Sequence, residues 1–216
     1  MKKLIWLLLI GGCALAQTAE EVALQLESTL RSYETFQADF EQFYYSSTIT
    51  TPLHEKGKVF FKKPALMKWE YKDPEEKVFL IKDDIFWDYN KEEELLTKYN
   101  LSEEEDNMEI ISLLSGRVGL LDTYRVEFSP FPTEKEKIKQ IKLTPKDTEY
   151  ADSFLLLEID EKTWQIHKII SFDWAGNKTE IHFSKFKKNP SLSRSTFELK
   201  VPPGTEIIEN QEVRRP

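Results

Sequence analysis

The amino-acid sequence predicts a mainly β protein, an unclosed antiparallel barrel that is covered by few helices. After one helical segment, the spacing of the apolar residues changes from three-and-four to two. Many short alternating segments then follow, and turn residues separate them, which is typical of an antiparallel meander. Only one later segment returns to helical spacing, so the apolar face of the sheet has little helix to cover it.

The first helix is predicted over residues 19–34. Thr18 and Glu21 have the spacing of a capping box, in which each residue satisfies a backbone N–H of the other. Apolar residues then recur at helical spacing, namely Val22, Ala23, Leu26, Leu30 and Tyr33. The period of two begins directly afterwards, at Phe36. We therefore expect an amphipathic helix that leads straight into the first strand.

The strands are predicted from alternation. Met67, Trp69 and Tyr71 point to one face, whereas Lys68 and Glu70 point to the other. The other alternating segments are 36–44, 85–89, 124–128, 140–143, 154–159, 164–174, 179–186 and 197–199. The turn signals between segments are Pro64, Asp73-Pro74, Asp83-Asp84, residues 160–162 and Gly176-Asn177. One face of such a sheet can face water while the other carries rows of aromatic side chains.

A second, shorter helix is predicted over residues 108–115. Met108, Ile111 and Leu114 share one side of it, and Gly116 is placed to end it. Two helices are too few to cover the whole apolar face of the predicted sheet permanently. We therefore expect a half-open barrel that is capped by few helices.

The N-terminus has the features of a secretory signal peptide over residues 1–16. Two lysines precede an apolar run over residues 4–10, and Ala14-Leu15-Ala16 is an A-x-A cleavage site. Residues 17–216 would then form a single exported domain. An alternative stays open, because residues 10–13 also resemble a lipobox, in which Cys13 would be acylated. No later segment is long and apolar enough to cross a membrane as a helix.

The composition disfavours several classes of function. The chain is acidic, with a formal net charge of −8, which makes nucleic acid or an anionic surface a poor electrostatic partner. No nucleophile elbow, phosphate-binding loop or dinucleotide fingerprint is present. His54, His167 and His182 lack the spacing of a local metal motif. The alternative, that His167 and His182 meet across paired strands at a metal, is less favoured because such residues are more often on a solvent-facing strand surface. We therefore expect no catalysis, no cofactor and no metal.

Five segments, in order, resemble the outer-membrane lipoprotein carrier (LolA-type) family. Residues 36–42 (FQADFEQ) resemble its F-x-A-x-F-x-Q strand, and residues 57–71 resemble its G-x-x-x-x-[KR]-P-x-x-[FM]-x-W segment. Residues 78–90 end in a similar L-W-x-Y-N pattern, residues 143–146 resemble an L-x-P-K strand end, and residues 197–208 resemble the closing segment. The ordered set covers nearly the whole exported chain.

This resemblance implies an unclosed barrel of about eleven strands, with helices as a lid over an apolar cavity. It also implies a periplasmic, monomeric carrier of lipoprotein acyl chains. Such a carrier takes lipoproteins from an inner-membrane ABC-type release complex and delivers them to an outer-membrane receptor of the same fold.

The resemblance also implies roles for particular residues. The family's latch arginine, which holds the empty lid closed, corresponds to Lys63, and a lysine lacks the planar fork of an arginine. Lys63 is therefore either a lid latch or an ordinary surface lysine. We expect the acyl chains to contact Leu26, Leu30, Met67, Trp69, Met108, Ile111 and Leu114. The alternative for each of these is that it is plain core.

Three other functions stay open at this point. The first is the outer-membrane receptor of the same fold, which would be tethered through an acylated Cys13. The second is a periplasmic sensor of lipids or mislocalised lipoproteins. A periplasmic hydrolase is the third, and it is the least supported because no catalytic motif accompanies it.

Overall fold

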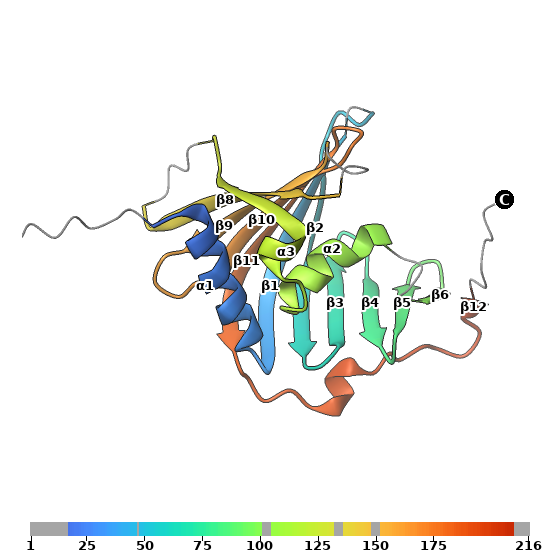
Figure 1. The fold of residues 1–216 in the computed structure, drawn as a ribbon. Coiled ribbons are helices and arrows are strands. Elements are labelled where there is room, and N and C mark those ends of the chain that lie inside the picture. Colours follow the sequence, from blue (N-terminus) through green and yellow to red (C-terminus); the bar gives the residue numbers. More distant parts are fainter. Residues whose placement is uncertain (1–16, 47, 101–104, 132–135, 148–151, 210–216) are drawn as a thin grey trace, which may run out of the picture.

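The computed structural model describes residues 17–46, 48–100, 105–131, 136–147 and 152–209. The described strands form one twelve-stranded sheet in the order β12-β6-β5-β4-β3-β2-β1-β11-β10-β9-β8-β7. The two edge strands, β12 and β7, do not pair with each other, so the sheet is not closed into a barrel (Figure 1). The predicted fold class is confirmed.

Apart from the pairing of β12 with β6, each pair of neighbouring strands is antiparallel. The strands are β1 (Thr35–Tyr45), β2 (Leu53–Lys62), β3 (Leu66–Asp73), β4 (Lys77–Lys82), β5 (Ile85–Asn90), β6 (Leu95–Asn100), β7 (Tyr124–Phe128), β8 (Ile138–Pro145), β9 (Phe154–Asp160), β10 (Ile166–Phe172), β11 (Lys178–Lys188) and β12 (Glu206–Glu209). The helices are α1 (Ala19–Arg31), α2 (Glu105–Leu114), α3 (Leu120–Thr123) and the 3-10 helix η3 (Arg194–Phe197).

Helix α1 begins as the sequence predicts. Thr18 Oγ1 accepts from Glu21 N at 3.2 Å, and Glu21 Oε2 accepts from Thr18 N at 3.0 Å, which completes the capping box. The helix ends at Arg31, three residues earlier than predicted. Tyr33 is buried, as its spacing indicates, but it lies in the connection to β1. Apolar spacing identifies a face and cannot show where the chain must turn into the sheet.

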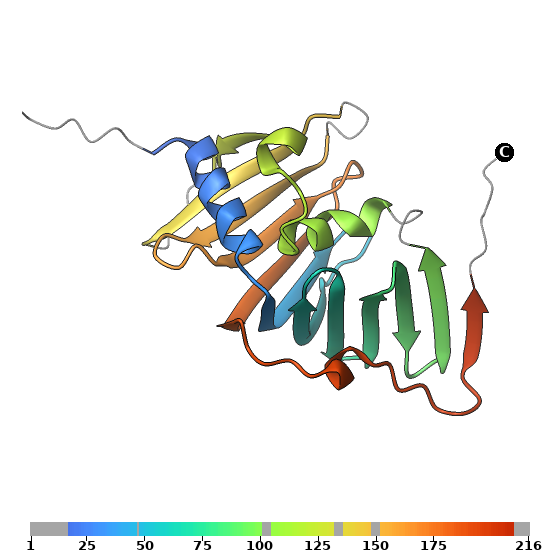
Figure 2. The same cartoon turned by 60° about the horizontal axis from the view of Figure 1, so that its bottom comes forward.

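The three α-helices lie on one face of the sheet, called here the inner face (Figures 1 and 2). Helices α1 and α3 lie over the β7–β10 side, and α2 lies over the side that includes β1 to β3. The inner face carries the aromatic and aliphatic rows, which form one main core with the helices. Figure 2 shows that the cover is incomplete, because β4, β5 and β6 extend beyond α2.

The C-terminal segment supplies β12, which the alternation did not predict, as it did not predict β2, β4 and β6. The strand predicted over residues 197–199 is wrong: Phe197 ends η3 and residues 198–200 lie in no strand, because their apolar side chains are buried by packing against the sheet and not by strand pairing. Residues 189–205 run from β11 past η3 to β12 (Figure 2). Leu199 and Val201 pack against Val78, Tyr89 and Leu96 in a second, smaller apolar cluster. Strand β12 then pairs in parallel with β6. The segment thus carries the chain from β11, in the middle of the sheet, to the edge beside β6.

The N-terminal predictions lie outside the described residues, since Cys13 and the cleavage site fall within residues 1–16. Among the residues that the structure describes, no helix has the length and hydropathy needed to cross a membrane.

Candidate functional site

A cavity of about 420 Å³ lies between α2 and the inner face of the sheet. Its volume falls within the range of pockets that hold small ligands. Seven of its lining residues are apolar or aromatic, namely Trp69, Tyr71, Phe79, Phe86, Ile110, Ile111 and Ile181. Five are polar, namely Gln42, Asp88, Ser171, Asp173 and Thr179.

The polar residues of this cavity form its rim at one end of the sheet. On β5 the wall changes from Phe86 to Asp88, and on β11 it changes from Ile181 to Thr179. Both changes run toward the end of the sheet where the β1–β2 and β10–β11 turns lie. The cavity therefore has an apolar floor and a polar rim, an arrangement that suits an amphipathic ligand.

The floor of the cavity is built from aromatic side chains on neighbouring strands. The ring of Trp69 packs edge-on against Phe40, with the centroids 4.9 Å apart. Tyr71 also packs against Phe40, and its hydroxyl donates to Gln42 Oε1 at 3.1 Å. Burial raises the pKa of the Tyr71 hydroxyl, so it stays a neutral hydrogen-bond donor. These contacts hold the floor rigid while the helix above it supplies the other wall.

Helix α2 supplies that other wall through Ile110 and Ile111, which are both half-buried. Leu113 and Leu114, one turn further on, are buried in the main core. The helix therefore inserts its C-terminal end into the core and spans the cavity with the preceding turn.

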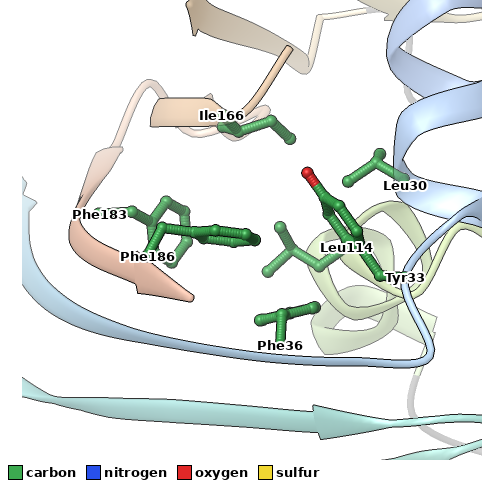
Figure 3. Close-up of a pocket in the computed structure, with 7 residues that line it drawn as sticks. All are labelled: Leu30, Tyr33, Phe36, Leu114, Ile166, Phe183 and Phe186. Carbon is green, nitrogen blue, oxygen red and sulfur yellow. The ribbon is translucent and has the colours of Figure 1, made fainter. Parts of the chain in front are cut away.

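The region under α1 is packed differently. Residues from α1, α2 and three strands surround a void of only about 10 Å³, which has room for no more than about one water molecule. Figure 3 shows its lining side chains pointing toward one another: Leu30, Tyr33, Phe36, Leu114, Ile166, Phe183 and Phe186. Burial raises the pKa of Tyr33 to about 12. No acyl chain fits this space while both helices are in place.

The predicted cargo-contacting residues separate into three groups. Trp69 and Ile111 line the 420 Å³ cavity. Leu30 and Leu114 border the small void, and Leu26 and Met67 are fully buried in the main core. Met108 lies in α2, but its side chain is outside what the structure describes. The prediction of their contact with acyl chains stays a prediction.

Sequence reasoning missed Phe79, Phe86 and Ile110 in the cavity wall. The alternation in β5 was visible, but it cannot tell which of its two faces is the inner one. Trp87 and Tyr89 lie on the outer face, under the C-terminal segment, and the inner face carries Phe86 and Asp88. The change from apolar to polar residues along one face of a strand was the available signal.

Lys63 contacts helix α1. Its Nζ donates to the carbonyl oxygen of Arg31 at 2.6 Å, and it lies 3.3 Å from Glu34 Oε1. A lysine at this position satisfies a free carbonyl at the C-terminal end of the helix and complements its dipole. Lys63 thus connects the β2–β3 turn to α1.

The C-terminal end of α2 is fastened at Gly116 and Arg117. Gly116 N donates to Leu113 O and Arg117 N donates to Ser112 O, which is a Schellman motif, as the sequence predicted from the glycine. Gly116 has a φ of +68°, and a Cβ there would lie 3.1 Å from the backbone of Leu30 and Arg31. Only glycine permits both the turn and this close approach.

Two side chains then fix this end of α2 to its neighbours. Arg117 Nη2 donates to Pro64 O at 3.1 Å, in the turn that also carries Lys63. Arg31 Nε lies 3.4 Å from Gly116 O, and it also pairs with Glu27 at 2.8 Å. Arg117 therefore connects the end of α2 to the β2–β3 turn, and Lys63 connects the end of α1 to the same turn.

Further toward its N-terminus, α2 contacts β7 through a buried polar pair. Tyr124 OH donates to Glu109 Oε1 at 2.9 Å. Burial raises the pKa of the Glu109 carboxyl, and the hydrogen bond from Tyr124 opposes the shift. A charged Glu109 is therefore less favourable here than in water.

The fold and the cavity define a class of protein: an open, curved β-sheet with helices over one face and a cavity with an apolar floor between them. The pattern of the family described as "Outer membrane lipoprotein carrier protein LolA" matches residues 31–200. The chain belongs to this family.

Named relatives agree with this assignment, and one solved structure shares the fold. An outer-membrane lipoprotein carrier protein of Pseudomonas putida is 27% identical over 195 residues, or 89% of each chain. One of Vibrio cholerae is 28% identical over 208 residues, covering 96% of this chain and 98% of that protein. An uncharacterized conserved protein from Thermus thermophilus has a similar fold, with a TM-score of 0.55 at 15% identity, covering 90% of this chain and all of that one.

Proposed function

We propose that this protein carries lipoproteins across the periplasm by burying their acyl chains in the cavity under α2. The observation that carries the proposal is the 420 Å³ cavity with an apolar floor and a polar rim. Membership of the carrier family supports it. The donor would be an inner-membrane ABC-type release complex and the acceptor an outer-membrane receptor, with the carrier acting as an exported monomer after loss of residues 1–16.

The physical requirement for such a carrier is large. Moving one methylene group from an apolar environment into water costs about 0.8 kcal/mol of free energy. A lipoprotein with two or three acyl chains therefore does not leave a membrane unless another apolar surface replaces the bilayer. The cavity in its closed form is the size of a single small-ligand site. Loading a whole lipid anchor requires the cover to move.

The movable part of the cover is α2. In the closed state Ile110 and Ile111 occupy space next to the aromatic floor, and the Arg117 contact holds the end of the helix. In the loaded state acyl chains replace these side chains, and α2 moves away from the sheet. Lys63 acts as a latch indirectly, because it fixes α1, against which the end of α2 rests. Release then requires only an acceptor with a higher affinity.

The test is capture of lipoproteins from inner-membrane vesicles by the Ile111→Glu variant. A carboxylate in the cavity wall should lower capture at least about tenfold, because acyl chains that enter the cavity would have to desolvate it. Leu24→Glu is the matched control, since Leu24 lies on the outer side of α1 and is half exposed. Equal capture by Ile111→Glu and the unaltered protein would refute the assignment of the cavity.

The second candidate is the tethered outer-membrane receptor, which the lipobox-like sequence before Cys13 favours. Labelled palmitate incorporated at Cys13 and recovery of the protein with membranes would support it. Recovery in osmotic-shock fluid, with Gln17 as the N-terminus, would support the carrier.

A further inference from the structure

One end of the sheet exposes two large apolar side chains, one at each of two neighbouring turns. Trp174, in the β10–β11 turn, is 78% exposed, and Leu53, at the start of β2, is 57% exposed. Strands β1 and β11 pair up to Tyr45 and Lys178, so the β1–β2 and β10–β11 turns lie side by side, at the upper end of the sheet in Figure 1. Exposed apolar residues that cluster, in contrast to single ones, indicate a contact surface.

This end of the sheet is the mouth of the cavity. On the inner face, Leu53 pairs with Tyr44, Tyr44 pairs with Thr179, and Thr179 pairs with Ser171. Directly paired residues point to the same face, so the four form one row across four strands. Thr179 and Ser171 also line the cavity. A ligand that passes this row enters the space under α2.

The outer face of the same end carries aromatic rings and lysines. Lys178 Nζ lies 3.9 Å from the centroid of the Tyr45 ring, and it also pairs with Glu180 at 2.7 Å. Next to it, the rings of Phe172 and Phe154 stack with centroids 4.5 Å apart. Lys142 Nζ lies 4.8 Å from the Phe154 centroid. Aromatic rings with lysines beside them are typical of the boundary between lipid headgroups and hydrocarbon.

We propose that this end of the sheet is a membrane-docking lip, in which Trp174 and Leu53 insert into the headgroup layer of a phospholipid bilayer. The partner is a lipid surface because the exposed side chains of Trp174 and Leu53 suit the boundary between headgroups and acyl chains, where aromatic rings and lysines of this kind are also common. The lip places the cavity mouth at the membrane surface beside the proposed donor complex, so an acyl chain released there enters the cavity with little exposure to water. This use of the lip rests on the proposed carrier function.

The first test is flotation of the purified protein with vesicles of phosphatidylethanolamine and phosphatidylglycerol. Trp174→Ser should lower vesicle association about tenfold, and Leu53→Ser should lower it by less, because less apolar area is lost. Trp174→Phe should keep most of the association. Leu24→Ser is the matched control, because Leu24 is 51% exposed on the outer side of α1. Association should persist at high salt, since aromatic insertion carries it.

The second test is uptake of a pyrene-labelled acyl lipid, which separates docking from carriage. From vesicles, Trp174→Ser should slow uptake about tenfold, whereas uptake from detergent micelles should not change. Lipid uptake by a protein that does not float with vesicles would overturn the lip and leave the carrier function standing. Flotation that depends on Trp174, without any lipid uptake, would support the lip and overturn the carrier function. A loss seen only when membrane proteins are present would make the lip a protein contact and overturn the proposal.

Discussion

The two regions of the inner face that the helices cover are packed in different ways. Under α1 the side chains meet around a void of about 10 Å³, and Leu26 is fully buried. Under α2 a cavity of about 420 Å³ separates the helix from the aromatic floor. The sheet is continuous and its apolar rows run through both regions, so the difference comes from the helices above it.

Each helix is suited to its own region. Helix α1 has 13 residues, a complete capping box and five buried apolar side chains, so it behaves as part of the core. Helix α2 has 10 residues, buries Leu113 and Leu114 at its C-terminal end, and spans the cavity with the preceding turn. The two helices are therefore not equivalent parts of the cover: α1 is packed into the core, whereas α2 spans a cavity, and the proposed function assigns the movement to α2.

The largest expected effect tests this difference directly. Leu26→Ala, under α1, should lower the free energy of unfolding by about 2–5 kcal/mol, because it leaves a cavity in packed core. Ile111→Ala, next to an existing cavity, should lower it by less than about 1.5 kcal/mol. Denaturant unfolding of both variants measures the contrast. Equal losses would mean that the two regions are packed alike.

An intermediate effect concerns the contacts that hold each helix. Arg117→Ala removes the hydrogen bond between α2 and the β2–β3 turn, worth about 1 kcal/mol. Hydrogen exchange of the α2 amides should then speed up about fivefold, as that energy implies. Lys63→Ala should speed exchange mainly at the end of α1, which Lys63 contacts. If Lys63→Ala loosened α2 as much as Arg117→Ala does, Lys63 would be the direct latch.

The smallest effect is a pH dependence confined to α2. Because burial raises the folded-state pKa of Glu109, the stabilisation linked to its protonation is complete below its unfolded pKa of about 4.3 and is lost as pH rises through the folded pKa. Glu109→Gln keeps an acceptor for Tyr124 and cannot ionise. It should be more stable than the unaltered protein at pH 7, by less than about 1 kcal/mol.

The same comparison at acid pH supplies the control for this prediction. The advantage of Glu109→Gln should shrink as pH falls toward 4.3, where the native carboxyl is itself neutral. Thermal unfolding measures this advantage. If the extra stability of Glu109→Gln were the same at both pH values, Glu109 would not be held in a buried site that raises its pKa.

Local features of the sequence predicted much of the architecture correctly. The Thr18–Glu21 pair marks the start of α1, and Gly116 marks the end of α2, because capping depends on a few neighbouring residues. The alternation in β3 placed Trp69 on the cavity side. By contrast, the alternation in β5 left the roles of Phe86 and Trp87 undecided, since both faces of that strand are apolar and both are covered.

The sequence by itself determined the mainly β class, the two principal helices and the resemblance to lipoprotein carriers, because periodicity, caps and motifs are local properties of the chain. Tertiary structure alone decided that α1 fills its half of the inner face while α2 leaves a cavity. It also decided that β12 returns in parallel beside β6 and that Trp174 stands at the mouth. Packing density and the meeting of distant turns depend on segments far apart in the chain, and no local pattern records them.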